Sequence, residues 1–452
     1  MTYFLDPFGC AKNQVDAENI LASLNAAGWA AADNGENADL IIINSCGFIE
    51  SAKQESINAV LLWRRLCPEK KILLAGCLSQ RYAKELKLSL PEADGFFGNS
   101  DLNGIVETAA ALVNKQSAKL ADAKLAGAKP KGANSSGSRP LLSLPGSAYV
   151  KISEGCDNRC SYCAIPLIRG GLKSRPLQDL LEECKTLLGR GIKELCLVGQ
   201  DLGSYGRDLT ANSAGLYGLL EALSGLKGDF WVRLLYIHPD NFPMNILDII
   251  KRDKRFLPYF DIPFQHGSEK ILKNMNRRGN AKAYLELINV IRKRLPDAVI
   301  RSTFMCGFPG ETGEDFSALV DFQEKAALDW LGCFVYSREE DTPAYNMKGR
   351  VPKKIAAERK RLVEEKQIPI TEKQMERFVG RTFDVLIEEK LEAPETGEGT
   401  IYLGRLFCHA PEIDGSAVID MPGEMSLGTI VPCRLTGRAG FDLQVQVLLP
   451  QD

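Results

Sequence analysis

The sequence predicts an α/β protein in three parts: a parallel α/β sheet domain, a central partial barrel of strand–helix units, and a small C-terminal β-barrel. Three observations predict it. Apolar strands alternate with helices in the first part, six strand–helix units follow, and five short strands with Gly-rich turns end the chain. Apolar, β-branched strands that alternate with helices are typical of parallel sheets. A chain of 452 residues is also too long for one ordinary domain.

The first part, residues 1–114, is expected to form the parallel α/β domain. Strands are predicted at 2–8, 39–44 and 71–75, and helices at 15–27 and 50–66. The next segment, 115–147, is rich in Ala, Lys, Gly and Ser and has little apolar surface to bury. It is predicted to be a flexible linker, although its positive charge also suits contact with a polyanion.

The middle part, residues 148–378, repeats a strand followed by a helix. Strands are predicted at 148–153, 194–199, 231–237, 259–264, 299–306 and 331–336, and helices include 177–188 and 283–294. A full eight-unit barrel needs about 250 residues, so six units predict a partial barrel. A long charged helix at 353–378 is expected to lead out of it.

The last part, residues 379–452, is expected to form a small β-barrel similar to an OB-fold. Its short strands are predicted at 383–387, 401–406, 417–420, 429–435 and 443–448.

Composition excludes several classes of protein. A net charge of −2 gives no overall attraction to nucleic acid or anionic membrane. No apolar run is long enough to span a bilayer, and the N-terminus lacks the features of a signal peptide, so a cytoplasmic protein is expected. The 13 cysteines do not suit a short secreted disulfide scaffold. In a reducing compartment they predict metal ligands together with buried core thiols.

Cys156, Cys160 and Cys163 carry the strongest functional signal. They form a CxxxCxxC pattern directly after an apolar strand. Three close thiolates can bind three irons of a 4Fe–4S cluster and leave the fourth iron open for a substrate or cofactor. The alternative is a structural zinc knuckle, but structural zinc takes four protein ligands and no fourth Cys or His lies nearby. We call these three residues the central cysteine set.

This motif resembles that of the radical S-adenosylmethionine (SAM) enzymes. The resemblance implies an open (β/α)6 barrel and a 4Fe–4S cluster whose open iron takes the amino and carboxylate groups of SAM. It also implies that one electron from the cluster splits SAM into methionine and a 5′-deoxyadenosyl radical. The protein would bind and orient SAM and would exclude side reactions.

Cys10, Cys46 and Cys77 share a position rather than a motif. Each follows an apolar strand, and the carboxyl ends of parallel strands line one crevice where ligands bind. The three thiols, here the N-terminal cysteine set, can therefore converge on one site, although three buried core thiols are the alternative. Cys67 follows a helix and is a poor fourth ligand.

The three-part layout with both cysteine sets resembles the methylthiotransferases over essentially the whole chain. The resemblance implies that the C-terminal module is a TRAM domain and that Cys10, Cys46 and Cys77 hold a second 4Fe–4S cluster with one open iron. Segments similar to the RimO-type branch are 44–55, 163–170, 336–343 and 410–414. That branch methylthiolates the β-carbon of an aspartate in ribosomal protein uS12. The long linker and His238-Pro239 are departures, and neither is a cluster ligand.

Charge separates this branch from its tRNA-modifying alternative. Residues 381–452 hold twelve acidic and five basic residues, a net charge of −7. An RNA-binding module should be basic because phosphate neutralisation dominates its affinity. An acidic module suits a basic ribosomal protein instead, so direct nucleic-acid binding is not expected to dominate, although a merely solvated acidic surface is possible. A tRNA methylthiotransferase should carry a basic barrel, and a non-catalytic Fe–S carrier would not need a barrel of this size.

The resemblance implies a reaction in which SAM is both radical source and methyl donor. The radical would remove a β-hydrogen from the aspartate, the second cluster would carry the sulfur, and a flavodoxin or ferredoxin would donate electrons. Weaker cofactor-binding candidates are Tyr162, inside the cysteine loop, and Gln200, Gly307 and Glu311, near strand ends where barrel active sites lie. Each suits turn formation equally well, and His266 suits a structural hydrogen bond as well as it suits a functional role.

Overall fold

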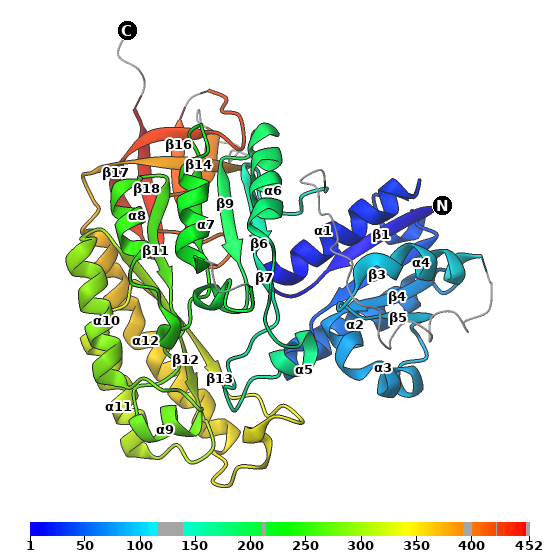
Figure 1. The fold of residues 1–452 in the computed structure, drawn as a ribbon, viewed down its shortest axis with the longest axis horizontal. Helices are drawn as coiled ribbons and strands as arrows, with labels where there is room; N and C mark the ends of the chain where they lie inside the picture. The colour runs from blue at the N-terminus through cyan, green and yellow to red at the C-terminus, as the bar shows by residue number, and fades with distance from the viewer. Residues whose placement is uncertain (115–138, 210–213, 392–399, 422, 449–452) are drawn as a thin grey trace. The chain divides into compact units, whose positions relative to one another are not determined.

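The computed structural model describes residues 1–114, 139–209, 214–391, 400–421 and 423–448 (Figure 1). The chain forms two compact units that do not follow chain order. Unit 1 comprises Met1–Leu142, Ser153–Thr186 and Ser337–Tyr345, and unit 2 comprises Ser143–Ile152, Leu187–Tyr336 and Asn346–Asp452. The central cysteine set thus belongs to the same unit as the N-terminal cysteine set.

Unit 1 contains a five-stranded parallel sheet in the order β2-β1-β3-β4-β5. Its strands are β1 (Thr2–Pro7), β2 (Ala30–Ala31), β3 (Leu40–Ser45), β4 (Lys71–Gly76) and β5 (Gly95–Phe97). Every residue of β3 is buried. A central strand covered on both faces explains its unbroken apolar run. The parallel α/β domain predicted from the sequence is confirmed.

Helices cover both faces of this sheet. They are α1 (Ala11–Ala26), α2 (Glu50–Leu66), α3 (Cys77–Ser89) and α4 (Ile105–Val113). Ile41 and Ile43 pack with Val60 of α2 in one core, while Ile42 packs with Leu24 of α1 in the other. Alternate residues of a strand point to opposite faces, so β3 feeds both cores.

Unit 1 also contains α5 (Ile165–Arg169) and an antiparallel pair, β7 (Ser153–Glu154) with β8 (Lys173–Ser174). Helix α6 (Leu177–Gly189) crosses the boundary between the units.

Unit 2 contains a six-stranded sheet in the order β13-β12-β11-β10-β9-β6, in which every pair is parallel. Its strands are β6 (Ser147–Lys151), β9 (Glu194–Val198), β10 (Trp231–Leu234), β11 (Phe256–Asp261), β12 (Val299–Cys306) and β13 (Trp330–Val335). Its helices are α7 (Gly215–Ser224), α8 (Ile246–Arg252), α9 (Glu269–Asn274), α10 (Ala281–Arg294), α11 (Gly313–Ala326) and α12 (Lys353–Glu376). The predicted six-unit partial barrel is confirmed.

Two strands of the six-stranded sheet differ from the predicted bounds by three residues. Strand β10 ends at Leu234 rather than residue 237, because Tyr236 has a φ of 69° that breaks the extended conformation. Strand β11 begins at Phe256 and ends at Asp261, earlier than predicted, and Gln265 beyond it has a φ of 71°. In both places an apolar run continues into a buried turn, which periodicity cannot separate from a strand.

The C-terminal part of unit 2 is a closed barrel in the order β14-β15-β16-β18-β17, which confirms the predicted small β-barrel. Its strands are β14 (Thr382–Leu391), β15 (Thr400–Arg405), β16 (Ala417–Met421), β17 (Ile430–Ala439) and β18 (Asp442–Val447).

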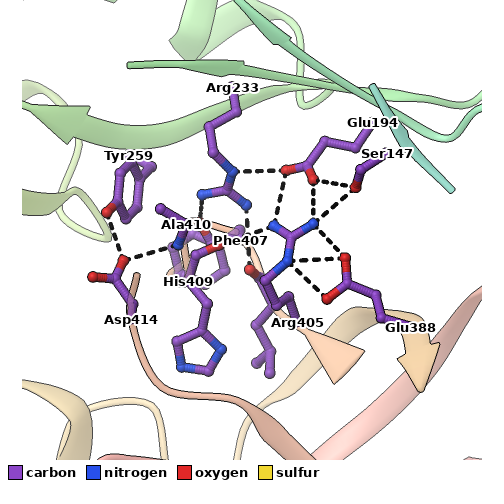
Figure 2. Close-up of polar contacts among 11 residues, drawn as sticks. Ser147, Glu194, Arg233, Tyr259, Glu388, Arg405, Phe407, His409, Ala410 and Asp414 are labelled. Carbon is purple, nitrogen blue, oxygen red and sulfur yellow. Dashed lines mark hydrogen bonds and ion pairs between the residues drawn. The ribbon is translucent and has the colours of Figure 1, made fainter. Parts of the chain in front are cut away.

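A buried ionic network joins this small barrel to the six-stranded sheet within unit 2 (Figure 2). Arg405 of β15 pairs with Glu388 of β14 and with Glu194 of β9, while Arg233 of β10 lies 2.7 Å from Glu194. Burial alone would raise the pKa of Glu194, but Arg405 and Arg233 outweigh it and lower that pKa to about 2. Glu194 is therefore a shared anion between two buried guanidinium groups.

Most of the predicted linker, residues 115–138, lies outside the described residues. Its described end is packed: Arg139 is fully buried, lies 2.7 Å from Glu18 of α1 and also pairs with Glu183. The domain boundaries at 114, 147 and 378 stay a prediction. No helix in the described ranges combines the length and apolarity needed to cross a membrane.

Candidate functional site

The N-terminal cysteine set lies at one edge of the unit 1 sheet. Cys46 directly follows β3, Cys77 directly follows β4, and Cys10 precedes α1 after β1. These strands are adjacent, and the last residues of β3 and β4, Ser45 and Gly76, are register partners. The topology therefore brings the three cysteines to a common edge, as the sequence predicts.

Two glycines show how closely the loops at this edge approach. Gly9 has a φ of 98°, and a Cβ there would lie 3.2 Å from the Cβ of Cys46. A Cβ on Gly47 would lie 2.8 Å from the backbone of Cys77. Side chains larger than glycine would push the loops apart, so glycine at these positions helps hold the cysteines close to each other.

Polar side chains from three different segments surround the sulfur of Cys77. Asn99 Nδ2 and Arg169 Nη2 each lie 3.2 Å from Cys77 Sγ and donate to it, while Asn13 Oδ1 lies 3.8 Å away. Asn13 also donates through Nδ2 to the carbonyl of Phe8 at 2.6 Å, which fixes the start of α1 against the β1 loop. Cys77 is thus held in a fixed polar setting.

The three thiols differ in pKa. Cys10 keeps exposed surface, but surrounding atoms still desolvate its thiol and would raise its pKa. The positive charges of Lys12 and Arg169 and hydrogen bonds from backbone N–H groups outweigh this effect, so the pKa of Cys10 is lowered overall. Burial raises the pKa of Cys46 to about 11 and also raises that of Cys77. Neighbouring thiols contribute to both increases, whereas Arg169 opposes them.

The central cysteine set lies on a loop that is closed at its base by the β7–β8 pair. The backbone N–H of Cys156 donates to the carbonyl of Gly170 at 3.1 Å, and that of Cys163 donates to the carbonyl of Cys160 at 3.1 Å. Gly155 has a φ of 68°, and a Cβ there would lie 2.0 Å from the carbonyl oxygen of Gly171. Only glycine fits this closure. All three cysteines are partly exposed.

Helix α5 brings the two cysteine sets into one neighbourhood. It begins two residues after Cys163, and Ala164 and Ile168 form a buried apolar cluster with Cys77. The segment that carries the central set therefore packs directly on a member of the N-terminal set.

The 337–345 segment contacts both neighbourhoods. Its Ala344 N–H donates to the carbonyl of Ser161, inside the cysteine loop, at 2.8 Å. Its Glu339, 2% exposed, lies 2.7 Å from Arg81 of α3 and 3.1 Å from Lys53 of α2. Arg81 in turn donates to the carbonyl of Gly47, next to Cys46, at 3.2 Å.

These donor sets suit iron–sulfur clusters better than single metal ions. Within the described ranges, no three or more His, Cys, Asp or Glu residues are grouped as ligands of one ion. Cluster ligands need not converge on one point, because each thiolate binds a different iron. Three thiols and the N–H donors that Asn99 and Arg169 direct at a sulfur fit such a group at the N-terminal set.

The weaker candidates belong to different units. Tyr162 lies in the cysteine loop of unit 1, whereas Gln200, Gly307 and Glu311 lie in unit 2. Gln200 follows β9 closely. Gly307 N–H donates to Glu311 Oε2 at 2.8 Å, and Arg359 of α12 pairs with the other carboxylate oxygen. The carboxylate of Glu311 is therefore engaged within the protein, and its role in SAM binding stays a prediction.

The structure also shows the contacts of His266 and of three residues that the sequence analysis did not single out. His266 Nδ1 accepts from the backbone N–H of Ser268 at 2.9 Å, a structural hydrogen bond. Sequence reasoning missed Arg169, Asn13 and Glu339. For Arg169 the sequence did hold one signal, a charged residue at the end of the short apolar segment Ile165–Arg169. An arginine buried with such a segment needs polar partners.

Comparisons with known proteins agree with this architecture. Residues 2–98 match the model described as uncharacterized protein family UPF0004, residues 150–322 match the radical SAM superfamily, and residues 379–448 match the TRAM domain. Among solved structures, the radical SAM methyltransferase TsrM from Kitasatospora setae, with cobalamin and a [4Fe-4S] cluster bound, has a TM-score of 0.57 at 14% identity and covers 76% of each chain. That likeness shows the fold alone.

Curated relatives match over nearly the whole chain. A protein of Treponema denticola named ribosomal protein uS12 methylthiotransferase RimO is 46% identical, covering 97% of this chain and 99% of that protein. Its namesake from Carboxydothermus hydrogenoformans is 40% identical, covering 98% and 99%. With both cysteine sets, the radical SAM domain and the TRAM domain in place, the chain belongs to the RimO family of radical SAM methylthiotransferases.

Proposed function

We propose that this enzyme adds a methylthio group to the β-carbon of an aspartate in ribosomal protein uS12. Membership of the radical SAM superfamily implies a 4Fe–4S cluster and SAM. We assign that cluster to Cys156, Cys160 and Cys163, and a second 4Fe–4S cluster to the N-terminal cysteine set. The observation that carries the proposal is the presence of both three-cysteine sets in one compact unit, in a chain that matches the uS12 methylthiotransferases from end to end.

When bound, a SAM-ligated cluster supplies a carbon-centred radical that can remove hydrogen from an unactivated C–H bond, which acid–base groups cannot do at neutral pH. The protein supplies the surroundings. The β7–β8 pair and Gly155 close the loop of the central set, and α5 keeps that loop against Cys77. We assign sulfur carriage to the N-terminal set and methyl donation to a second SAM.

The substrate assignment follows from the relatives and from charge. Every relative named above carries uS12 in its name. The net charge of −7 in residues 381–452 also favours a basic protein partner over RNA. We also propose that the reaction takes place in the cytoplasm and that a flavodoxin or ferredoxin donates the electron.

The test is anaerobic. Reconstituted enzyme, SAM and a chemical reductant are offered purified uS12 or bulk tRNA, and both are examined by mass spectrometry. We expect a methylthio group on an aspartate of uS12. A gain on a tRNA base instead would refute the substrate assignment while leaving the chemistry in place.

Two variants divide the roles of the cysteine sets. Cys160→Ala should abolish formation of 5′-deoxyadenosine, whereas Cys46→Ala should retain it and lose only the methylthio product. A Cys46→Ala enzyme that still methylthiolates uS12 would refute the role given to the N-terminal set.

A further inference from the structure

Arg169 is a buried arginine that connects the two cysteine sets. It is the last residue of α5, six positions after Cys163, and its side chain is 1% exposed. Burying a guanidinium is costly unless it is paired and hydrogen-bonded. The partners of Arg169 therefore indicate why an arginine is buried at this position.

Those partners come from three segments. Arg169 Nη2 lies 3.2 Å from Cys77 Sγ, 3.4 Å from Asn13 Oδ1 and 3.0 Å from Asp16 Oδ2. Nη1 lies 2.7 Å from Glu154 Oε1, in the strand that precedes the central cysteine loop. One planar group thus spans α1, the start of α3 and β7. The fixed fork of an arginine can do this, whereas a single lysine ammonium cannot reach all of these atoms in the same geometry.

A purely structural ion pair would not account for the contact with sulfur. Asp16 and Glu154 already supply two carboxylates for one positive charge. The guanidinium nevertheless donates to Cys77 Sγ at 3.2 Å. It therefore reaches a member of the N-terminal set from a helix that belongs to the central cysteine segment.

Charge and hydrogen bonds at ligand sulfurs set the reduction potentials of iron–sulfur clusters. A buried positive charge favours the reduced, more negative state. The reduction potential matters for the proposed reaction. When a carbon radical joins a methylthiolate, the new C–S bond takes one electron from the radical and one from a sulfur lone pair. The remaining electron must be accepted, and an iron–sulfur group held by Cys10, Cys46 and Cys77 would be able to accept it.

We propose that Arg169 is a positioning residue that holds Cys77 for the N-terminal cluster and raises the reduction potential of that cluster. This inference rests on the proposed function, since that function assigns a cluster to Cys10, Cys46 and Cys77.

The test isolates one cluster in the full-length chain. A parent in which Cys156, Cys160 and Cys163 are all alanine can hold only the N-terminal cluster. In this parent, R169Q and R169M remove the charge and R169K retains it without the fork. Iron and sulfide content, thermal unfolding of the apoprotein and the midpoint potential in an EPR-monitored titration are measured for each. R139Q is the matched control, because Arg139 is also fully buried in unit 1 and pairs with Glu18 on α1.

We expect both neutral variants to lower the midpoint potential or to lose iron, and R169K to recover part of the loss. R139Q should keep the parent potential and iron content even where it lowers the unfolding temperature. The proposal can be judged on either neutral variant, provided that it folds. A folded R169Q or R169M with full iron content and an unchanged midpoint potential would overturn the role of Arg169. If the parent itself binds no iron, the assignment of the second cluster fails instead, so the two failures are distinguishable.

Discussion

Removing the carboxylate of Glu194 should weaken unit 2 substantially. In Glu194→Gln, Arg405 keeps Glu388 as an ion-pair partner, whereas the buried Arg233 loses the carboxylate that it pairs with (Figure 2). The pKa of Glu194 falls from 4.5 to about 2 in the folded protein. Since one pKa unit corresponds to about 1.4 kcal/mol, folding favours the ionised form by about 3 kcal/mol. Breaking a buried ion pair by removing one partner costs a similar ~3–5 kcal/mol.

The assay is urea unfolding of the apoprotein at pH 7, followed by tryptophan fluorescence. Trp330 is a suitable reporter, because its Nε1 donates to the carbonyl of Cys408 at 2.7 Å in unit 2. Because the two units need not unfold together, Trp29 and Trp63 of unit 1 are replaced by Phe in every variant, so that the fluorescence transition reports unit 2. We expect Glu194→Gln to lower the unfolding free energy by about 3 kcal/mol.

Glu388→Gln provides the control. Burial raises the pKa of Glu388, and Arg405 does not overcome it, so the folded protein gains less from ionising this carboxylate. Glu388→Gln should therefore cost less than Glu194→Gln. Because the pKa of Glu194 is lowered on folding, its contribution is complete above pH 4.5 and disappears as the pH falls through 2. A loss below about 1 kcal/mol at pH 7, as for a surface pair, would refute this reasoning.

Three further outcomes follow from other sites. Burial raises the pKa of Asp414 to about 6, above its ordinary 3.8, so Asp414→Asn should stabilise the protein by up to about 3 kcal/mol above pH 6 and make no difference below pH 4, as thermal unfolding across pH would show. Glu339→Gln breaks buried ion pairs and should cost about 3 kcal/mol, measured by thermal unfolding, while the exposed Glu340→Gln should cost little. Gly155→Ala should lower the iron content of the enzyme and its 5′-deoxyadenosine yield. Gly170→Ala carries the same strain of a positive φ (73°) but has open space around its Cβ, so it should be milder; equal iron content in both would contradict the closure argument.

The fold follows closely from local pattern. The bounds of α2 and β12 match those predicted, because each pattern ends at a clear change in periodicity or at polar residues. The convergence of Cys10, Cys46 and Cys77 also follows, since neighbouring parallel strands end at one edge. Pattern is less informative where an apolar run turns, as after β10 and β11.

The surroundings of the site could not be predicted in the same way. Arg169 meets Asn13 across 156 positions of sequence, and no periodicity encodes such a contact. Glu311 shows the reverse problem: its place after a strand suggests a ligand contact, but Arg359 and the backbone of Gly307 already engage its carboxylate. Long-range polar pairing depends on tertiary packing, which a single sequence does not reveal.

The interleaved make-up of unit 1 has a consequence for how the protein is made. Cys10, Cys46 and Cys77 emerge early, but Arg169 and the 337–345 segment, which complete their surroundings, emerge much later. At roughly 5–20 residues per second, the ribosome needs roughly 15–50 s to pass from Cys77 to Tyr345. During that interval the nascent chain presents three thiols on an incomplete domain. The iron–sulfur loading proposed for these cysteines would therefore be a late step in biogenesis, and oxidation of the exposed thiols during synthesis would be the hazard to limit.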